Sequence, residues 1–246
     1  MNTSMLIDEL ITYLFDGEPH ILAESMEKWL ASSRRFTAFV NSHHTKIRKK
    51  LRTVQSAENL RDLQLELETS YLLLRERSLS VAYEPQHPEL GRSPDFAVTF
   101  TTSLTFMVEV TRLRSAGPGR SNTPVAGMLS GDRFTDMLCS KLGQLLSQRG
   151  NLLVVGVETS QLADYDPRGT MLRIQQRAEG NDSMIVHKHG FRDRADFFSH
   201  YYRLSALLVR GIPLQVGKHI IIWDNPQAKY PLPGKVRAAL VRSHTL

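Results

Sequence analysis

The chain has 246 residues, of which 41% are hydrophobic, a formal net charge of +6 and one cysteine, Cys139. This length suits one large domain or a core domain with an extension, and no apolar run approaches the roughly 20 residues of a membrane span. Without a recognisable secretory leader or an internal disulfide framework, we expect a cytoplasmic protein that contacts no membrane, and the basic balance favours an anionic partner.

Residues 1–55 are predicted to form a helical, basic N-terminal extension, and residues 56–246 a core domain. Apolar residues at helical spacing, interrupted at 16–19, indicate two helices within 4–32. Residues 33–55 combine an apolar side with cations and contain no acid. These cations are Arg34, Arg35, Lys46, Arg48, Lys49, Lys50 and Arg52. A basic amphipathic helix binds phosphates well, so we expect nucleic-acid contact here; a solvated helix face is the alternative.

A long helix is predicted over residues 57–77 because leucines recur on one side of it. Glu66 lies on the flank of that apolar stripe, where an acid is either partly solvated or paired. Residues 80–85 are then predicted to form a strand that ends at Pro85.

Residues 94–111 alternate apolar and polar side chains twice, which predicts two strands joined at 101–103. The expected register pairs residue 96 with 108, 98 with 106 and 100 with 104, so Asp95 and Glu109 fall opposite each other on one face. Opposed carboxylates repel, and such a pair persists if one is protonated or if a cation lies between them. A divalent ion with oxygen ligands is the usual occupant, and a solvated sheet face is the alternative.

Residues 112–131 are rich in Gly, Pro and Ser, which predicts either a flap beside the carboxylates or a plain surface insertion. A helix is expected over 132–148, with Lys141 and Gln144 on the same side, followed by a central strand over 151–158. Further helices are predicted over 166–179 and 194–210, a last strand over 219–223 and a short helix over 235–242. His187 and His189 are interpreted as part of a surface turn rather than a metal site.

The order of Glu66 on a helix, Pro94-Asp95 before one strand and Glu109-Val110-Thr111 on the next resembles the PD-(D/E)XK nuclease superfamily. Its pattern is a helical Glu, a strand, Pro-Asp, a strand, acid-x-Lys, a helix and a strand, and the match covers about residues 60–160. The resemblance implies an α/β fold: a restriction-endonuclease-like core with a central mixed β-sheet flanked by helices, preceded here by the helical extension.

The chain departs from this pattern at one position. The lysine of the pattern should stand two residues after Glu109, where the chain has Thr111. Some members of the superfamily supply that lysine from the following helix, and Lys141 fits such a displacement, with Gln144 beside it. Arg112 is a weaker substitute, because its side chain leaves the strand on the face opposite Glu109.

The resemblance implies a Mg²⁺- or Mn²⁺-dependent endonuclease that hydrolyses phosphodiester bonds in nucleic acid, with DNA the expected substrate. Asp95, Glu109 and the carbonyl of Val110 would coordinate the metal, and Glu66 would orient a metal-bound water or complete the shell of a second ion.

Lys141 would position or deprotonate the water, and Gln144 would bind a phosphate oxygen or the lysine. The basic residues between 34 and 52, with Arg112 and Arg114, would hold the nucleic-acid backbone. Many nucleases of this kind dimerise, which leaves a homodimer open. Two alternatives stay open: a catalytically degenerate fold that acts as a nucleic-acid-binding or complex-forming module, and a small-molecule enzyme that uses the carboxylate pair for metal-assisted hydrolysis.

Overall fold

The structure is a computed structural model that describes residues 5–86, 93–114, 126–214 and 220–244, without the side chains of 126–132. In chain order the elements are α1 (Ile7–Phe15), α2 (Ala23–Ser32), α3 (Arg34–Thr53), α4 (Ala57–Arg75), β1 (Leu79–Tyr83), β2 (Phe96–Phe100), β3 (Leu104–Arg112), α5 (Ala126–Leu142), β4 (Asn151–Glu158), the 3₁₀ helix η1 (Thr159–Asp164), α6 (Pro167–Glu179), α7 (Arg194–Tyr201), β5 (Leu204–Ile212), β6 (Ile221–Asp224) and α8 (Gly234–His244). The fold is therefore α/β, with a helical N-terminal part as expected.

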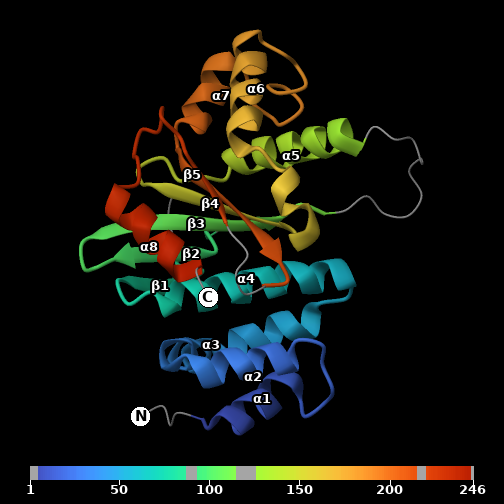
Figure 1. Cartoon of the computed structure of the whole chain (residues 1–246), viewed down its shortest axis with the longest axis vertical. Helices are drawn as coiled ribbons and strands as arrows, with labels where there is room; N and C mark the ends of the chain where they lie inside the picture. The colour runs from blue at the N-terminus through green and yellow to red at the C-terminus, as the bar shows by residue number, and fades with distance from the viewer. Residues whose placement is uncertain (1–4, 87–92, 115–125, 215–219, 245–246) are drawn as a thin grey trace.

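The strands form one six-stranded mixed sheet in the order β1-β2-β3-β4-β5-β6. β1, β2 and β3 form an antiparallel meander, β4 and β5 run parallel to β3, and β6 returns antiparallel. Parallel neighbours need a crossover connection, and α5 supplies the one between β3 and β4. Figure 1 shows the sheet between two helical layers, with α4 and the N-terminal helices on one side and α5, α6 and α7 on the other.

The predicted hairpin register is confirmed: Phe96 pairs with Val108, Val98 with Phe106 and Phe100 with Leu104. This pairing sends the apolar members of both strands to the α4 side, where Phe96 and Val108 are fully buried. The intervening residues of β3 face the other helical layer, because side chains alternate along a strand.

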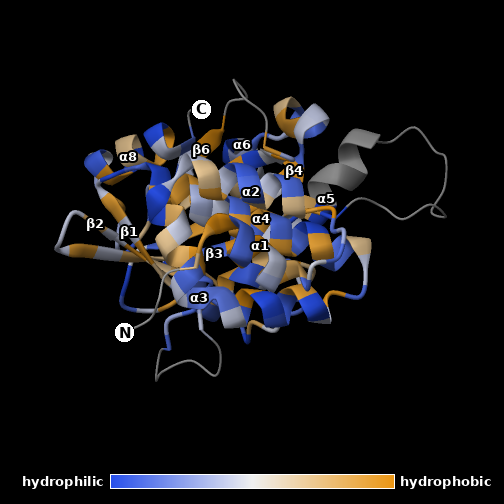
Figure 2. Ribbon diagram, turned by 90° about the horizontal axis from the view of Figure 1, so that it is seen from below, coloured by the Kyte–Doolittle hydropathy of each residue, from blue (hydrophilic) through white to orange (hydrophobic). Residues whose placement is uncertain are grey.

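Two hydrophobic clusters fill the space on the two sides of the sheet. One joins the N-terminal helices, α4 and α8 to the sheet face that carries Val108, and it includes Leu10 and Phe36. The other joins α5, α6 and α7 to the opposite face, which carries Leu153. Figure 2, seen from the side of the N-terminal helices, shows α3 as predominantly hydrophilic on its visible surface. Among the helices described, none combines the length and apolar character needed to cross a membrane.

The prediction of a helix over 194–210 is wrong for its second half. α7 ends at Tyr201, and Leu204–Ile212 forms β5, a strand buried along almost its whole length beside β4. In a short segment that is buried on both faces, nearly every residue is apolar. The spacing of apolar residues therefore cannot distinguish a strand from a buried helix. The last strand lies at Ile221–Asp224, and the predicted position 219 falls outside the described residues.

The helix predicted over 132–148 lies earlier in the chain. α5 spans Ala126–Leu142, so residues 126–131, predicted as loop, are helical, whereas residues 115–125 lie outside the described part of the chain. Gly127 and Gly131 argue against a helix by propensity, which explains the error. After Leu142 the chain turns, and the Asn151 side chain bonds the backbone of Leu146 through both its oxygen (3.1 Å) and its nitrogen (2.9 Å).

Candidate active site

Asp95 and Glu109 meet at the open end of the β2–β3 hairpin. Asp95 stands immediately before β2, and its Oδ2 accepts a 2.7 Å hydrogen bond from the backbone N–H of Val110. Glu109 is 4% exposed and pairs in register with Leu153, a member of the cluster on the α5 side. The two carboxylates are therefore placed near each other by the same register that buries the apolar face, as the sequence predicted.

Burial, and after it the negative charge of Glu109, raise the pKa of Asp95 to about 7, against the opposing hydrogen bond from Val110. Glu66 adds a weaker repulsion, and Lys141 acts in the opposite direction. An aspartate whose pKa is raised by desolvation and by a like charge is a site at which a cation would be stabilised.

Lys141 approaches this pair from the last turn of α5. Its Nζ lies 3.5 Å from Glu109 Oε2, and its side chain is largely buried. Gln144, by contrast, lies beyond the end of α5, where its N–H donates to the Lys141 carbonyl at 3.0 Å. The prediction that Lys141 and Gln144 share one side of a helix is wrong, because the helix ends at Leu142.

Glu66 comes from α4, on the opposite face of the sheet. Its Oε1 accepts hydrogen bonds from Lys50 Nζ at 2.6 Å and from the Tyr83 hydroxyl at 2.5 Å. Burial raises the pKa of Tyr83, and the Glu66 charge raises it further, so the phenol keeps its proton and acts as the donor. Glu66 is thus a paired acid rather than a solvated one.

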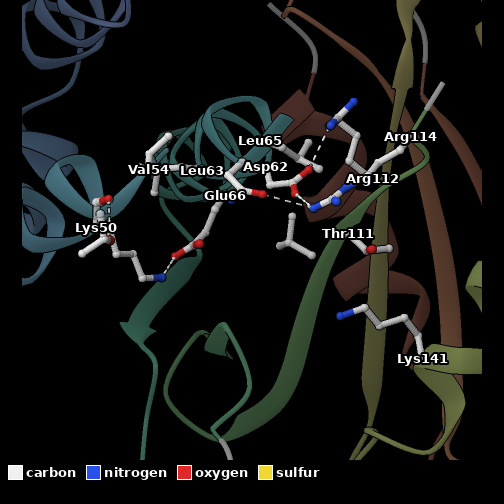
Figure 3. Close-up of a pocket in the computed structure, with 13 residues that line it drawn as sticks. Lys50, Val54, Asp62, Leu63, Leu65, Glu66, Thr111, Arg112, Arg114 and Lys141 are labelled. Carbon is white, nitrogen blue, oxygen red and sulfur yellow. Dashed lines mark hydrogen bonds and ion pairs between the residues drawn. The ribbon is translucent and has the colours of Figure 1, made fainter. Parts of the chain in front are cut away.

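A pocket of about 570 Å³ separates α4 from the end of β3 and also reaches the end of α3 (Figure 3). Its lining residues are Lys50, Thr53, Val54, Asn59, Asp62, Leu63, Leu65, Glu66, Val110, Thr111, Arg112, Arg114 and Lys141. Figure 3 shows Lys50 and Glu66 pointing toward one another on one side, while Lys141 extends toward the pocket from another. Asp95 and Glu109 are not among these lining residues, and Lys141 connects Glu109 with the pocket.

Within the described ranges, no group of three or more His, Cys, Asp or Glu side chains is arranged to hold a metal ion. Of the predicted ligands, the structure thus brings Asp95 and Glu109 together with the backbone of Val110 but does not gather Glu66 into one three-acid cluster with them. His187 and His189 lie in a turn, as interpreted from the sequence, and His189 Nε2 is 3.3 Å from Asp136.

Arg112 and Arg114 bind acids of α4. Arg112 leaves β3 on the face opposite Glu109, as predicted, and its guanidinium bonds Glu58 and, at 2.9 Å, Asp62. Arg114 reaches the second oxygen of Asp62 at 2.5 Å. Asp62 is a pocket residue that the sequence reasoning missed; its position four residues before Glu66, one helical turn away, was the available signal.

Several cations of the basic segment bind other groups of the same chain. Arg35 donates to the backbone carbonyls of Leu74 at 2.9 Å and Glu76 at 2.8 Å, which ties α3 to the end of α4. Arg48 and Arg52 both bind Asp16 beyond the end of α1, and hydrogen bonds from Arg52 and Arg48 lower the pKa of Asp16 to about 2.

Lys46 and Lys50 both bind Glu84, whereas Arg34 and Lys49 are exposed and have no hydrogen bond or ion pair with a residue that the structure describes. Much of the positive charge predicted to face nucleic acid is therefore balanced by acids elsewhere in the chain. Nucleic-acid binding by this segment stays a prediction.

No protein-family model matches the chain, and neither a curated protein nor a solved structure shows significant similarity to it.

Proposed function

We propose that the chain is a metal-dependent nuclease that hydrolyses phosphodiester bonds in nucleic acid, with DNA the expected substrate. The observation that carries the proposal is the placement of Lys141 Nζ 3.5 Å from Glu109 Oε2, on the carboxylate that faces Asp95 across the hairpin. The chain has Thr111 at the position where the PD-(D/E)XK pattern has its lysine. Lys141, on the following helix α5, would bring a positive charge to Glu109 in its place.

The arrangement of the elements supports the proposal. The chain has the element order α4, β1, β2, β3, α5, β4, with Glu66 on α4, Asp95 just before β2 and Glu109 on β3. The PD-(D/E)XK pattern has its helical Glu, its Pro-Asp and its second acid in this same order, followed by a helix and a strand. β3 and β4 are parallel neighbours joined through α5. We therefore also propose that the core domain has a restriction-endonuclease-like fold.

The donor atoms suit a hard divalent cation. Asp95, Glu109 and the carbonyl of Val110 are oxygen donors, which Mg²⁺ and Mn²⁺ prefer. The raised pKa of Asp95 expresses the electrostatic cost of a partly buried acid beside the buried Glu109, which a bound cation would relieve. When bound, the metal would supply Lewis-acid activation of water and of the phosphate.

The side chains around these donors have distinct roles. Lys141 balances the charge of Glu109 and presents an ammonium group to the pocket, where it would orient a phosphate oxygen or a water. The N–H of Val110 fixes one oxygen of Asp95, which restricts the rotation of that carboxylate. Glu66, in the pocket, would hold a water through an acceptor oxygen.

Plasmid nicking with Mg²⁺ or Mn²⁺ tests the proposal. We expect cleavage by the wild-type chain and its loss in both Asp95→Ala and Glu109→Ala. A fall of about 10² or more in rate is expected for Lys141→Met, as for other groups that position or protonate the reacting atoms. If nicking survives both alanine substitutions, the site assignment is wrong.

Thr111 favours a second candidate, because the lysine of the pattern is missing from its strand. In that case the fold would act as a nucleic-acid-binding or complex-forming module without turnover. Thermal stabilisation by Mn²⁺, without cleavage of any nucleic acid, would support this candidate. Dimerisation and a cytoplasmic location stay predictions.

A further inference from the structure

Lys50 belongs to the N-terminal helical part, yet it lines the same pocket as Glu66 and Lys141. We propose that Lys50 is a positioning residue. It fixes the carboxylate of Glu66, which would hold a water in the site, so α3 contributes a residue to the active site. This inference rests on the proposed function, and it adds a residue that the PD-(D/E)XK pattern does not contain.

The contact between the two side chains is direct and sheltered. Lys50 Nζ lies 2.6 Å from Glu66 Oε1, and the two side chains are 29% and 14% exposed. Burial lowers the pKa of Lys50, but the charges of Glu66 and Glu84 outweigh it and raise the pKa overall, so Lys50 stays charged. A charged donor at this distance makes a strong, directional hydrogen bond.

Both hydrogen bonds of Glu66 end on the same oxygen. Lys50 and the Tyr83 hydroxyl donate to Oε1, and Oε2 has no hydrogen bond with a residue that the structure describes. Two donors on one oxygen, one from α3 and one from β1, define the rotation of the carboxylate, while Oε2 is left as an acceptor. Tyr83 alone would restrict this rotation less.

Lys50 is itself held in place. It also binds Glu84, and its Nζ lies 4.9 Å from the centre of the Tyr83 ring. Glu84 in turn donates its backbone N–H to the Asp95 carbonyl at 2.8 Å. Lys50 is thus connected both to Glu66 and to the chain segment that carries Asp95.

Lys46 provides a matched control. It lies one helical turn earlier on α3, binds the other oxygen of Glu84 at 2.5 Å and also lies 4.9 Å from the Tyr83 ring centre. It has no bond with Glu66. Lys46→Met and Lys50→Met therefore remove the same charge and the same Glu84 partner, and they differ in the contact with Glu66.

The experiment compares these two variants in the full-length chain by plasmid-nicking kinetics. We expect Lys50→Met to lower kcat by about tenfold to a hundredfold with a smaller change in KM, as misplaced active-site groups do. Because Lys46 belongs to the same basic segment, any loss of nucleic-acid contact should affect Lys46→Met and Lys50→Met alike, and the fall in kcat should be confined to Lys50→Met; Lys50→Arg should recover most of the lost rate. In a Glu66→Gln background, Lys50→Met should cost nothing further, because it acts through Glu66.

A second readout does not need turnover. The Mn²⁺ concentration at which half of the metal-dependent rise in Tm is reached should be at least about threefold higher in Lys50→Met than in Lys46→Met. The two variants are compared by this midpoint rather than by Tm without metal, since Lys50→Met loses ion pairs with both Glu66 and Glu84 and Lys46→Met loses only the one with Glu84.

Each outcome is decisive. If the wild type cleaves but both methionine variants behave alike in rate and in Mn²⁺ response, the inference about Lys50 is overturned and the nuclease proposal stands. If the wild type responds to Mn²⁺ without cleaving, the nuclease proposal fails, and the Mn²⁺ midpoints alone decide the role of Lys50. A wild type that neither cleaves nor responds to Mn²⁺ overturns both.

Discussion

Replacing Asp95 with Asn should stabilise the metal-free protein at pH 8 and leave its stability nearly unchanged at pH 4. Asn has the shape of Asp, and its Oδ1 can accept the 2.7 Å hydrogen bond that the Val110 N–H donates to Asp95. It cannot ionise. The substitution therefore removes the buried charge beside Glu109 while leaving the local packing in place.

The magnitude follows from the pKa of Asp95, which burial and then the charge of Glu109 raise from 3.8 to about 7. Because the folded pKa is raised, the unfolded chain loses this proton near pH 4 and the folded chain near pH 7. Stability is therefore lost as pH rises between these values and is constant above them. The ionised carboxylate costs up to about 4 kcal/mol above pH 7, which is the gain expected for Asp95→Asn.

Urea unfolding followed by circular dichroism, with EDTA present, measures this gain at pH 4 and pH 8. Asp164→Asn, at an exposed aspartate, controls for the loss of a carboxylate elsewhere on the surface. If Asp95→Asn gives the same change in unfolding free energy at both pH values, Asp95 is not an acid whose ionisation is opposed by burial and by Glu109. The electrostatic reason for expecting a cation there would then be lost.

Three further outcomes follow from packing and burial. Burial lowers the pKa of His244 to about 3, so stability should be lost as pH falls from about 6.5 to 3, and His244→Gln should flatten that part of the acid-unfolding curve seen by circular dichroism. Arg35→Met should cost about 2–3 kcal/mol in urea unfolding, because it leaves backbone carbonyls at the α4–β1 junction without their donor; a change below 0.5 kcal/mol would contradict this role. Gly156→Ala would place a Cβ 2.3 Å from Ile212 Cδ1 and 2.7 Å from Leu65 Cδ2, so we expect a loss of about 1–3 kcal/mol, partly recovered with Ile212→Val; an unchanged Tm would refute the predicted clash.

The hairpin could be predicted from the sequence because both strands alternate apolar and polar residues without a break. A slip of one residue would have exposed Phe96 or Val108, so the hydrophobic pattern determined the register and, with it, the meeting of Asp95 and Glu109. The long helices α3 and α4 were predictable for a similar reason, since a sustained helical period has few alternatives.

The strand β5 could not be distinguished from a helix in the same way. Leu204–Ile212 is buried on both faces, and its neighbour β4 is contributed by a segment about fifty residues earlier in the chain. Its strand form depends on hydrogen bonds to that distant partner rather than on local propensity. The early start of α5 was hidden by its two glycines.

The pairing of charges in the site was also beyond sequence reasoning. Lys50 and Glu66 are 16 positions apart, and Arg112 and Asp62 are 50 apart, so no helical or strand spacing relates them. From the sequence, the cations of residues 33–55 were an uncompensated block. The fold supplies Asp16, Glu66 and Glu84 as their partners.

The central claim is that Asp95 and Glu109 bind a divalent cation beside Lys141. A crystal structure determined in the presence of Mn²⁺, with anomalous diffraction to locate the ion, tests it most directly. We predict an ion coordinated by both carboxylates, with the Lys141 ammonium facing the pocket. An ion bound elsewhere, or none at the hairpin while Asp95 and Glu109 keep their present contacts, would contradict the claim.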